Sequence, residues 1–158
     1  MTRSNMPEES ASAEGQVVFE LLNEVGIIAQ LSRALLESHL EDGLTIHHFT
    51  ALNHMVRLGD GQTPIEMARA FQVPKTSMSH TLAGLEKRDL IRLAPNPADG
   101  RGKLVLLTDA GRALRERAIQ NITPEIAKMI SLFEQNEAKR IWQSLRKLRT
   151  LLDSSRDK

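Results

Sequence analysis

The spacing of apolar residues changes at Asp89, and this change limits the folds open to the chain. Before it, apolar side chains recur every three to four positions, as on one face of a helix. After it come two short runs rich in branched residues, "LIRLA" and "KLVLLT", separated by residues 95–102 with two prolines and two glycines. We therefore predict a β-hairpin among helices, with an eight-residue loop, residues 95–102, at its tip.

Four helical segments are predicted before the hairpin. The first covers residues 16–40, and the second follows Thr45, a favourable N-cap, and ends at Gly59. The third starts with a capping box formed by Thr63 and Glu66 and ends near residue 71. The fourth, residues 74–89, follows after a tight turn.

Two short helices joined by a tight turn and followed by a strand–loop–strand have the element order of a winged helix-turn-helix. In that fold the outer face of the second short helix enters the major groove of DNA. Hydroxyl, imidazole and ammonium groups on this face can reach base edges or phosphates. The predicted contacts are Lys75, Thr76, Ser77, Ser79 and His80.

The predicted β-hairpin, which is the wing of this fold, is the second predicted DNA contact. An arginine at a hairpin tip, Arg101, can enter the minor groove beside the major groove that the helix occupies. Asp99 would repel phosphate, so we expect it to accept hydrogen bonds from Arg101 or from loop amides. Lys103 adds a positive charge at the base of the loop.

Wide apolar stripes at both ends of the chain predict a dimer. Thr108 caps a helix that we expect to kink or break at Pro124, and a last helix covers residues 136–152. The stripes are too wide for one small lobe to cover. They consist of Val18, Leu21, Leu22, Val25 and Ile28 near the start, and Ile126, Ile130, Phe133, Ile141, Leu145 and Leu148 near the end. Two-fold pairing would place two recognition helices about 34 Å apart on a palindromic site.

Composition and charge narrow the class of protein. The chain has 158 residues and no cysteine, which excludes disulfides and thiolate metal sites and fits the cytoplasm. Residues 1–56 carry two basic and eight acidic side chains, whereas residues 57–115 carry ten and six. A basic middle segment is compatible with a nucleic-acid surface. No phosphate-binding glycine loop or nucleophile motif indicates an enzyme.

The chain resembles the multiple-antibiotic-resistance regulator (MarR) family of bacterial transcription factors. The resemblance rests on "VPKTSMSHTLAGLEKRDLI" and "PNPADGRGKLVLLTDAGRAL", above all on Asp99-x-Arg101 followed by Leu107-Thr108-x-x-Gly111. It implies a dimer in which the N- and C-terminal helices of both chains interlock. It also implies minor-groove contact by Arg101 and repression relieved by a small aromatic or apolar effector. The implied effector pocket lies near Leu40, Leu44, Phe49 and Leu114.

We expect four segments: a flexible tail (1–15), an N-terminal dimerisation helix (16–44), a winged helix-turn-helix lobe (45–108) and C-terminal dimerisation helices (109–158). Several residues depart from the family pattern. Pro74 replaces a capping Ser or Asp, His80 replaces a base-contacting Arg, and Gly100 replaces a second tip Arg. Asp89 replaces a glycine after the recognition helix, and Asp tolerates the left-handed conformation.

Two alternatives to a DNA-binding regulator stay open. One is a winged-helix adaptor that binds proteins and has lost DNA binding. The other is a zinc-responsive regulator, with a histidine and Glu37, Glu41 or Asp42 as ligands. The five histidines have no spacing typical of a metal site, so we expect cap-region and surface histidines, no metal and no cofactor. The effector, the operator and the regulated genes are not encoded in any pattern of the sequence.

Overall fold

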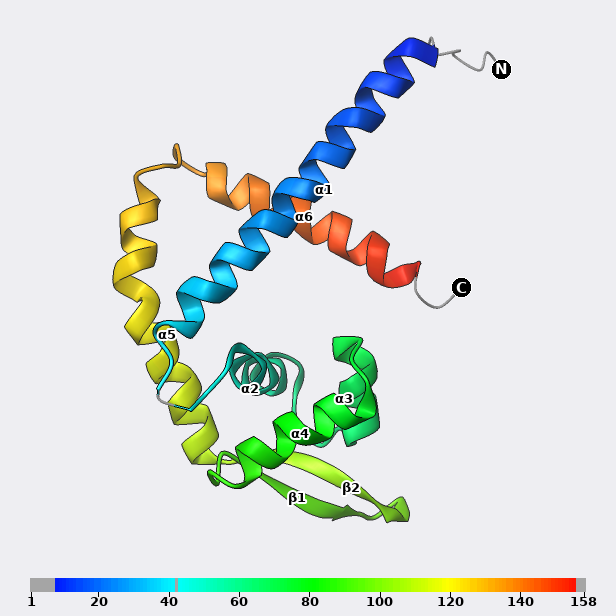
Figure 1. Cartoon of the computed structure of the whole chain (residues 1–158), viewed down its shortest axis with the longest axis vertical. Coiled ribbons are helices and arrows are strands. Elements are labelled where there is room, and N and C mark those ends of the chain that lie inside the picture. The colour runs from blue at the N-terminus through cyan, green and yellow to red at the C-terminus, as the bar shows by residue number, and fades with distance from the viewer. Residues whose placement is uncertain (1–7, 42, 156–158) are drawn as a thin grey trace. The chain divides into compact units, whose positions relative to one another are not determined.

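The computed structural model describes residues 8–41 and 43–155 (Figure 1). Their helices and strands are α1 (Glu8–Glu37), α2 (Ile46–Leu58), α3 (Pro64–Phe71), α4 (Lys75–Glu86), β1 (Ile91–Asn96), β2 (Asp99–Leu107), α5 (Asp109–Ile130) and α6 (Glu137–Ser154). The predicted order of helices and hairpin is confirmed, and the fold is mainly α with a small β-hairpin wing. The chain divides into two compact units, Met1–Ala118 and Ile119–Lys158.

α1 starts earlier than the sequence pattern predicts. Residues 8–15, which we expected in a flexible tail, form its first two turns, and residues 1–7 of that tail lie outside the described part. A single glycine inside this stretch, Gly15, costs a helix only about 1 kcal/mol, so it does not prevent the early start. Apolar periodicity missed these turns because no apolar side chain larger than alanine precedes Val17 in them.

Side-chain caps fix the starts of α2 and α3. The Thr63 N–H donates to Glu66 Oε2 at 2.7 Å, and the Glu66 N–H donates back to Thr63 Oγ1 at 3.2 Å. This confirms the capping box that the sequence predicts. The same two groups, the backbone N–H and the hydroxyl of Thr63, lower the pKa of Glu66. At α2, the Thr45 N–H donates to Nδ1 of His48 at 3.1 Å.

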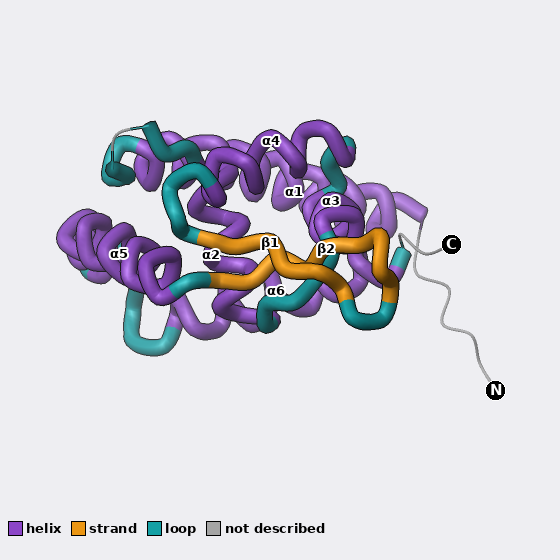
Figure 2. The backbone as a smooth tube through the Cα atoms, turned by 90° about the horizontal axis from the view of Figure 1, so that it is seen from below, coloured by secondary structure: helices purple, strands orange, loops and turns teal. Residues whose placement is uncertain are grey.

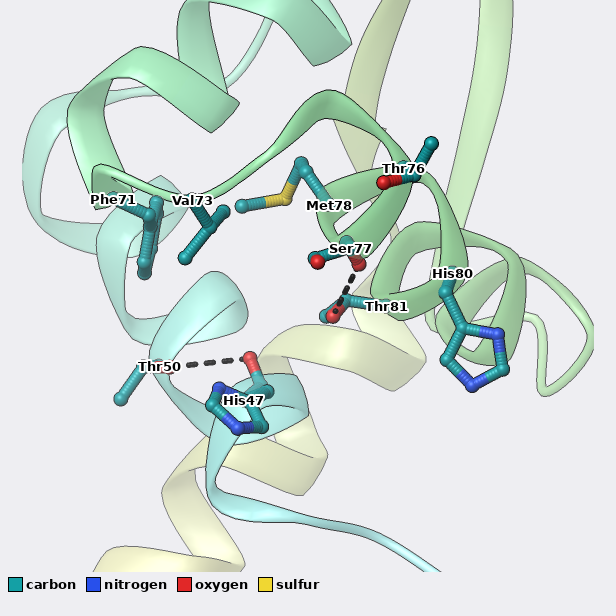
Figure 3. A pocket seen from close by; sticks show the side chains of 9 residues that line it. All are labelled: His47, Thr50, Phe71, Val73, Thr76, Ser77, Met78, His80 and Thr81. Atoms are coloured by element: carbon teal, nitrogen blue, oxygen red, sulfur yellow. Dashed lines mark hydrogen bonds between the residues drawn. The ribbon is translucent and has the colours of Figure 1, made fainter.

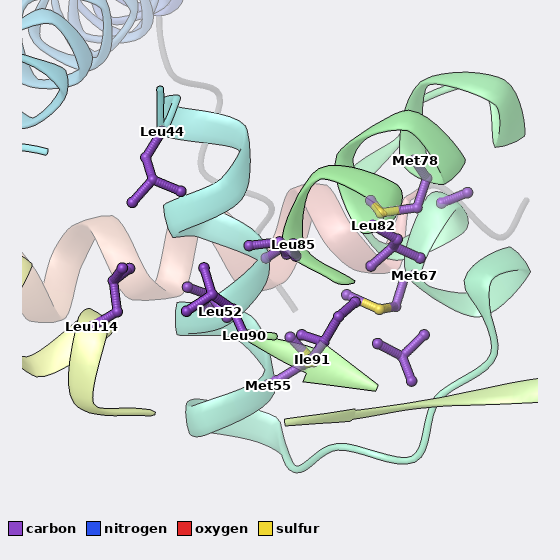
Figure 4. Close-up of a cluster of buried hydrophobic side chains, with 13 residues drawn as sticks. Leu44, Leu52, Met55, Met67, Met78, Leu82, Leu85, Leu90, Ile91 and Leu114 are labelled. Carbon is purple, nitrogen blue, oxygen red and sulfur yellow. The ribbon is translucent and has the colours of Figure 1, made fainter. Parts of the chain in front are cut away.

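The core of the first unit lies between α2, α3, α4 and the hairpin (Figure 4). Leu52, Met67, Leu85 and Val105 are fully buried within it. Burying an apolar side chain of this size stabilises the fold by about 1.5–3 kcal/mol. The other members of the cluster are Leu44, Ala51, Met55, Ala68, Met78, Leu82, Leu90, Ile91 and Leu114.

The first turn of α5 packs against the turn between α4 and β1. Thr108 Oγ1 donates to the Asp89 carbonyl at 2.7 Å and accepts from the Gly111 N–H at 3.0 Å, so Thr108 caps α5 as predicted. Gly111 has no side chain to separate it from Leu90, and a Cβ built there would overlap the Leu90 carbonyl oxygen. Asp89 adopts a left-handed φ of 56°, which confirms that it takes the role expected of a glycine.

The second unit contains the end of α5 and all of α6. α5 continues as one helix through Pro124, so the break that we considered at this residue does not occur. Proline removes one backbone hydrogen bond, and the flanking turns keep the remainder. α6 follows Asn136, and its predicted bounds are confirmed to within two residues. No helix in the described part of the chain is long and apolar enough to cross a membrane.

Candidate nucleic-acid interface

α3 and α4 form a helix-turn-helix. Gln72 ends α3 with a left-handed φ of 54°, and the Val73 N–H donates to the Ala68 carbonyl at 3.1 Å. Pro74 is the N-cap residue of α4, and its side chain accepts no hydrogen bond from the first N–H groups of that helix. Backbone bonds therefore close the end of α3, and only three residues separate it from α4.

α4 has one apolar and one polar face. Met78, Leu82 and Leu85 point into the core and are at most 3% exposed. The predicted contact residues lie on the opposite face, where Lys75, Thr76, Ser77, Ser79 and His80 are all exposed. Burial of the apolar face therefore fixes which side chains α4 presents to solvent.

The wing differs from its predicted form. Its strands run closer to the tip than expected, because Asn96 pairs with Asp99 and only Pro97 and Ala98 lie between them. The Ala98 N–H donates to Asn96 Oδ1 at 3.0 Å, which stabilises this turn. The predicted eight-residue loop is therefore wrong; Figure 2 shows the two strands side by side.

Three residues of β2 form a bulge next to this turn. Pro95 pairs with Lys103 and Asn96 with Asp99, so Gly100, Arg101 and Gly102 have no partners on β1. A Cβ at Gly102 would lie 3.3 Å from Asp99 Oδ2, so glycine permits the close fold of the bulge. Lys103 and Asp99 are exposed, and the side chain of Arg101 lies outside the described residues. The expected hydrogen bond between Asp99 and Arg101 stays a prediction.

The base of the wing is attached to the segment between α2 and α3. The Gly61 N–H donates to the Val105 carbonyl at 2.8 Å, and the Val105 N–H donates to the Gln62 carbonyl at 2.9 Å. Asp60 Oδ2 accepts from the Leu107 N–H at 2.8 Å. The sequence did not predict these contacts. Residues 59–63, "GDGQT", have the composition of a loop, and they pair with β2 only through one isolated bridge, between Gln62 and Val105.

A histidine lies between α2 and the candidate DNA-binding helix. The ring of His48 accepts the α2 cap bond and faces Gly84 of α4, where a side chain would collide with it. Burial lowers the pKa of His48, and the positive charges of Arg88, His47 and His80 lower it further. The expectation of a histidine near a helix cap is thus confirmed for His48.

The residues proposed for an effector pocket are packed in the core. Leu44, Phe49 and Leu114 are at most 8% exposed, and Leu40 packs against the same cluster. A cavity of about 510 Å³ lies elsewhere, between α2 and the helix-turn-helix (Figure 3). It is lined by His47, Thr50, Phe71, Val73, Thr76, Ser77, Met78, His80 and Thr81. The described residues hold no group of three or more side chains suited to a metal ion.

Comparison with known proteins agrees with this geometry. Residues 42–102 match the model of the MarR family. The wild-type apo MarR structure from E. coli is 25% identical, has a TM-score of 0.69, and matches over 81% of this chain and 95% of that one.

Two further structures share the fold. A cysteine-to-serine variant of E. coli MarR complexed with operator DNA is 24% identical, has a TM-score of 0.67, and matches over 83% of this chain and 94% of that one. Bordetella bronchiseptica BpsR, whose DNA binding is regulated by 6-hydroxynicotinic acid, is 23% identical with a TM-score of 0.67, over 82% of this chain and 98% of that one. The family match over the helix-turn-helix and wing, together with the shared fold, shows that this chain is similar to the MarR family of winged-helix transcriptional regulators.

Proposed function

We propose that the chain binds duplex DNA as a homodimer and represses transcription in the cytoplasm until a small molecule releases it. The observation that carries the DNA-binding part is the arrangement of α4. Its buried face is held by Met78, Leu82 and Leu85, while an unbroken polar face is exposed beside a hairpin that carries Arg101 and Lys103. A fixed helix with a free polar face and an adjacent basic hairpin fits a major and a minor groove.

The exposed groups divide into two kinds of DNA contact. Lys75 at the start of α4 and Lys103 on the wing supply positive charge for phosphates. Thr76, Ser77, Ser79 and His80 carry donors and acceptors that can reach base edges. Base preference therefore depends on α4, whereas the lysines set affinity and its dependence on salt.

Exposed apolar side chains support the homodimer. In α1, Val18 is 51% exposed and Ile28 is 53% exposed; in α6, Trp142 is 56% exposed. Soluble monomers rarely expose large contiguous apolar patches, and pairing of two chains would cover these helices. A two-fold dimer also presents two copies of α4, which suits a palindromic operator.

Relatives support regulation by a small molecule. BpsR is described as regulated in DNA binding by 6-hydroxynicotinic acid, and E. coli MarR has been solved on operator DNA. We extend both properties to this chain as part of the proposal. Repression follows if the dimer occupies an operator that overlaps a promoter.

Selection of bound fragments from random duplex DNA tests the proposal. We expect a palindrome whose half-sites lie about 10 base pairs apart, centre to centre. Recovery of no enriched sequence, together with weak and salt-independent binding, would favour the protein-binding adaptor. Adding zinc to the same binding reaction tests the zinc-responsive alternative, which requires operator affinity to change.

A further inference from the structure

Residues 60–62, between α2 and α3, hold the base of the wing. The Gly61 N–H donates to the Val105 carbonyl, and the Val105 N–H donates to the Gln62 carbonyl. Val105 is fully buried at this point. A contact that fixes this segment therefore also fixes where the wing lies.

His54 of α2 holds this segment through a side-chain hydrogen bond. Its Nε2 lies 2.8 Å from Oε1 of Gln62, and both residues are half-buried. An amide oxygen only accepts hydrogen bonds, so Nε2 of His54 carries a proton and donates it. Gln62 thus accepts at two oxygens, one from His54 and one from Val105 of the wing. It connects α2 to β2.

The same imidazole ring packs against the end of α3. The ring centroids of His54 and Phe71 are 5.0 Å apart, and the ring planes are inclined by 54°. This separation falls within the range of about 4.5–7 Å that aromatic pairs prefer. Phe71 is the last residue of α3, and three residues separate it from α4. His54 therefore contacts both the segment that holds the wing and the helix that leads into α4.

No other side chain of α2 in the described part of the chain forms a hydrogen bond with this segment. Asn53 accepts from Nε and Nη2 of Arg115 in α5 at 3.2 and 3.0 Å, and Thr50 bonds to a carbonyl of α2 itself. Contact with Phe71 alone would need only an apolar or aromatic residue. The hydrogen bond to Gln62 adds a fixed direction, which packing does not supply.

We propose that His54 is a positioning residue for operator recognition, which fixes the wing relative to α4. Two elements that enter neighbouring grooves must keep their relative placement to within about 0.5 Å and 10–20°. By holding that placement, His54 sets the number of base pairs between the bases that α4 contacts and the minor groove that the wing enters. The partner is an operator with a narrow, A·T-rich minor groove at one fixed distance from each half-site. The proposal rests on the proposed DNA-binding function and deepens it.

Three variants separate the hydrogen bond from the ring contact. His54→Phe keeps an aromatic ring against Phe71 and removes the donor, whereas His54→Gln removes the ring and places an amide N–H where Nε2 lies. Gln62→Met removes the acceptor at nearly the same side-chain length. Asn53→Ala is the matched control, because it removes a hydrogen bond of the neighbouring residue in α2 that leads to α5 instead of to the wing.

Amide hydrogen exchange of the full chain without DNA tests the attachment of the wing. We expect exchange at the Val105 N–H, relative to exchange at Leu85 in the core, to rise about 2- to 12-fold in His54→Phe, the effect of one hydrogen bond. Gln62→Met should give the same rise, and it decides the test alone if His54→Phe does not fold. His54→Gln and Asn53→Ala should give no rise. An unchanged ratio in His54→Phe and Gln62→Met, or an equal rise in Asn53→Ala, would overturn the proposal.

A double-mutant cycle with the wing tip tests the link to DNA. In the unaltered chain, in His54→Gln and in Asn53→Ala, the change Arg101→Ala should weaken operator binding about 5- to 150-fold. In His54→Phe the same change should cost about 2- to 12-fold less, because the wing is no longer held in place to use that contact. Loss of stability alone would lower every affinity without changing the effect of Arg101→Ala. An equal effect in all four backgrounds would refute the positioning role.

Selection from random duplex DNA gives a second readout and separates the two proposals. The unaltered chain should enrich half-sites with an A·T-rich flank at one spacing, and His54→Phe should enrich the same half-sites without a preferred flank. If both proteins enrich the same flank, the proposal for His54 fails and the DNA-binding function stands. If the unaltered chain enriches no sequence, the proposed function fails, and the operator role of His54 fails with it whatever the exchange at Val105.

Discussion

The contact between Gly111 and Leu90 predicts a large effect from one methyl group. A Cβ at position 111 would overlap the Leu90 carbonyl oxygen and lie 2.9 Å from Leu107 Cδ1. The obstacle is mainly backbone, so a rotamer change cannot relieve it and the first turn of α5 must move. Overpacking of this kind costs about 1–3 kcal/mol, and the move also strains the bond from the Gly111 N–H to Thr108.

Gly111→Ala should therefore lower the free energy of unfolding by about 1–3 kcal/mol, less a gain of up to about 1 kcal/mol in helix propensity. Gly15→Ala is the matched control: it makes the same change inside α1, where nothing lies within 4 Å of the added Cβ. Urea denaturation followed by circular dichroism measures both. A Gly111→Ala protein as stable as Gly15→Ala would show that α5 does not pack against the Leu90 carbonyl as described.

Three further predictions concern pH, assembly and the wing. Because the pKa of His48 is lowered in the folded state, the unfolded chain binds more protons, and stability should fall as pH decreases through the ordinary value near 6.5. His48→Gln, which can keep the cap bond, should flatten this dependence in urea titrations; an unchanged slope would exclude His48 as its source. Truncation before Asn136 should convert a dimer to a monomer in analytical ultracentrifugation and remove most DNA affinity, and a full-length monomer that binds a palindrome tightly would contradict this. Arg101→Ala should weaken operator binding by about 1–3 kcal/mol in fluorescence anisotropy without changing the unfolding midpoint, and equal affinity would remove the wing from the interface.

Local sequence signals predicted the parts of the fold that depend on local bonds. The capping box at Thr63 and Glu66 gave the start of α3, and Thr108 gave the start of α5, because each cap bond spans only three residues. The left-handed conformation of Asp89 was instead expected from the resemblance, because Asp89 stands where the family pattern has a glycine. The wing tip could not, because its pairing depends on the Asn96 turn and on a bulge, which apolar alternation does not encode.

Features built from distant segments were beyond sequence reasoning. The cavity joins His47 of α2 to the end of α3 and the start of α4, and none of these residues belongs to a motif for ligand binding. The bond from Asp60 to the Leu107 N–H joins residues 47 positions apart. The polar face of α4 was predictable. The spacing of Met78, Leu82 and Leu85 identifies the buried side of the helix, so the other side must be exposed.

The salt dependence of operator binding tests the DNA-binding account most directly. Lys75 and Lys103 in each chain give four phosphate-neutralising charges in a dimer, so log K against log salt should have a slope of about −4. Lys75→Gln removes two of them and should reduce the slope by about 2, whereas Lys128→Gln, in the second unit, should leave it unchanged. A slope near zero, or one that Lys128→Gln changes as much as Lys75→Gln, would contradict binding through α4 and the wing.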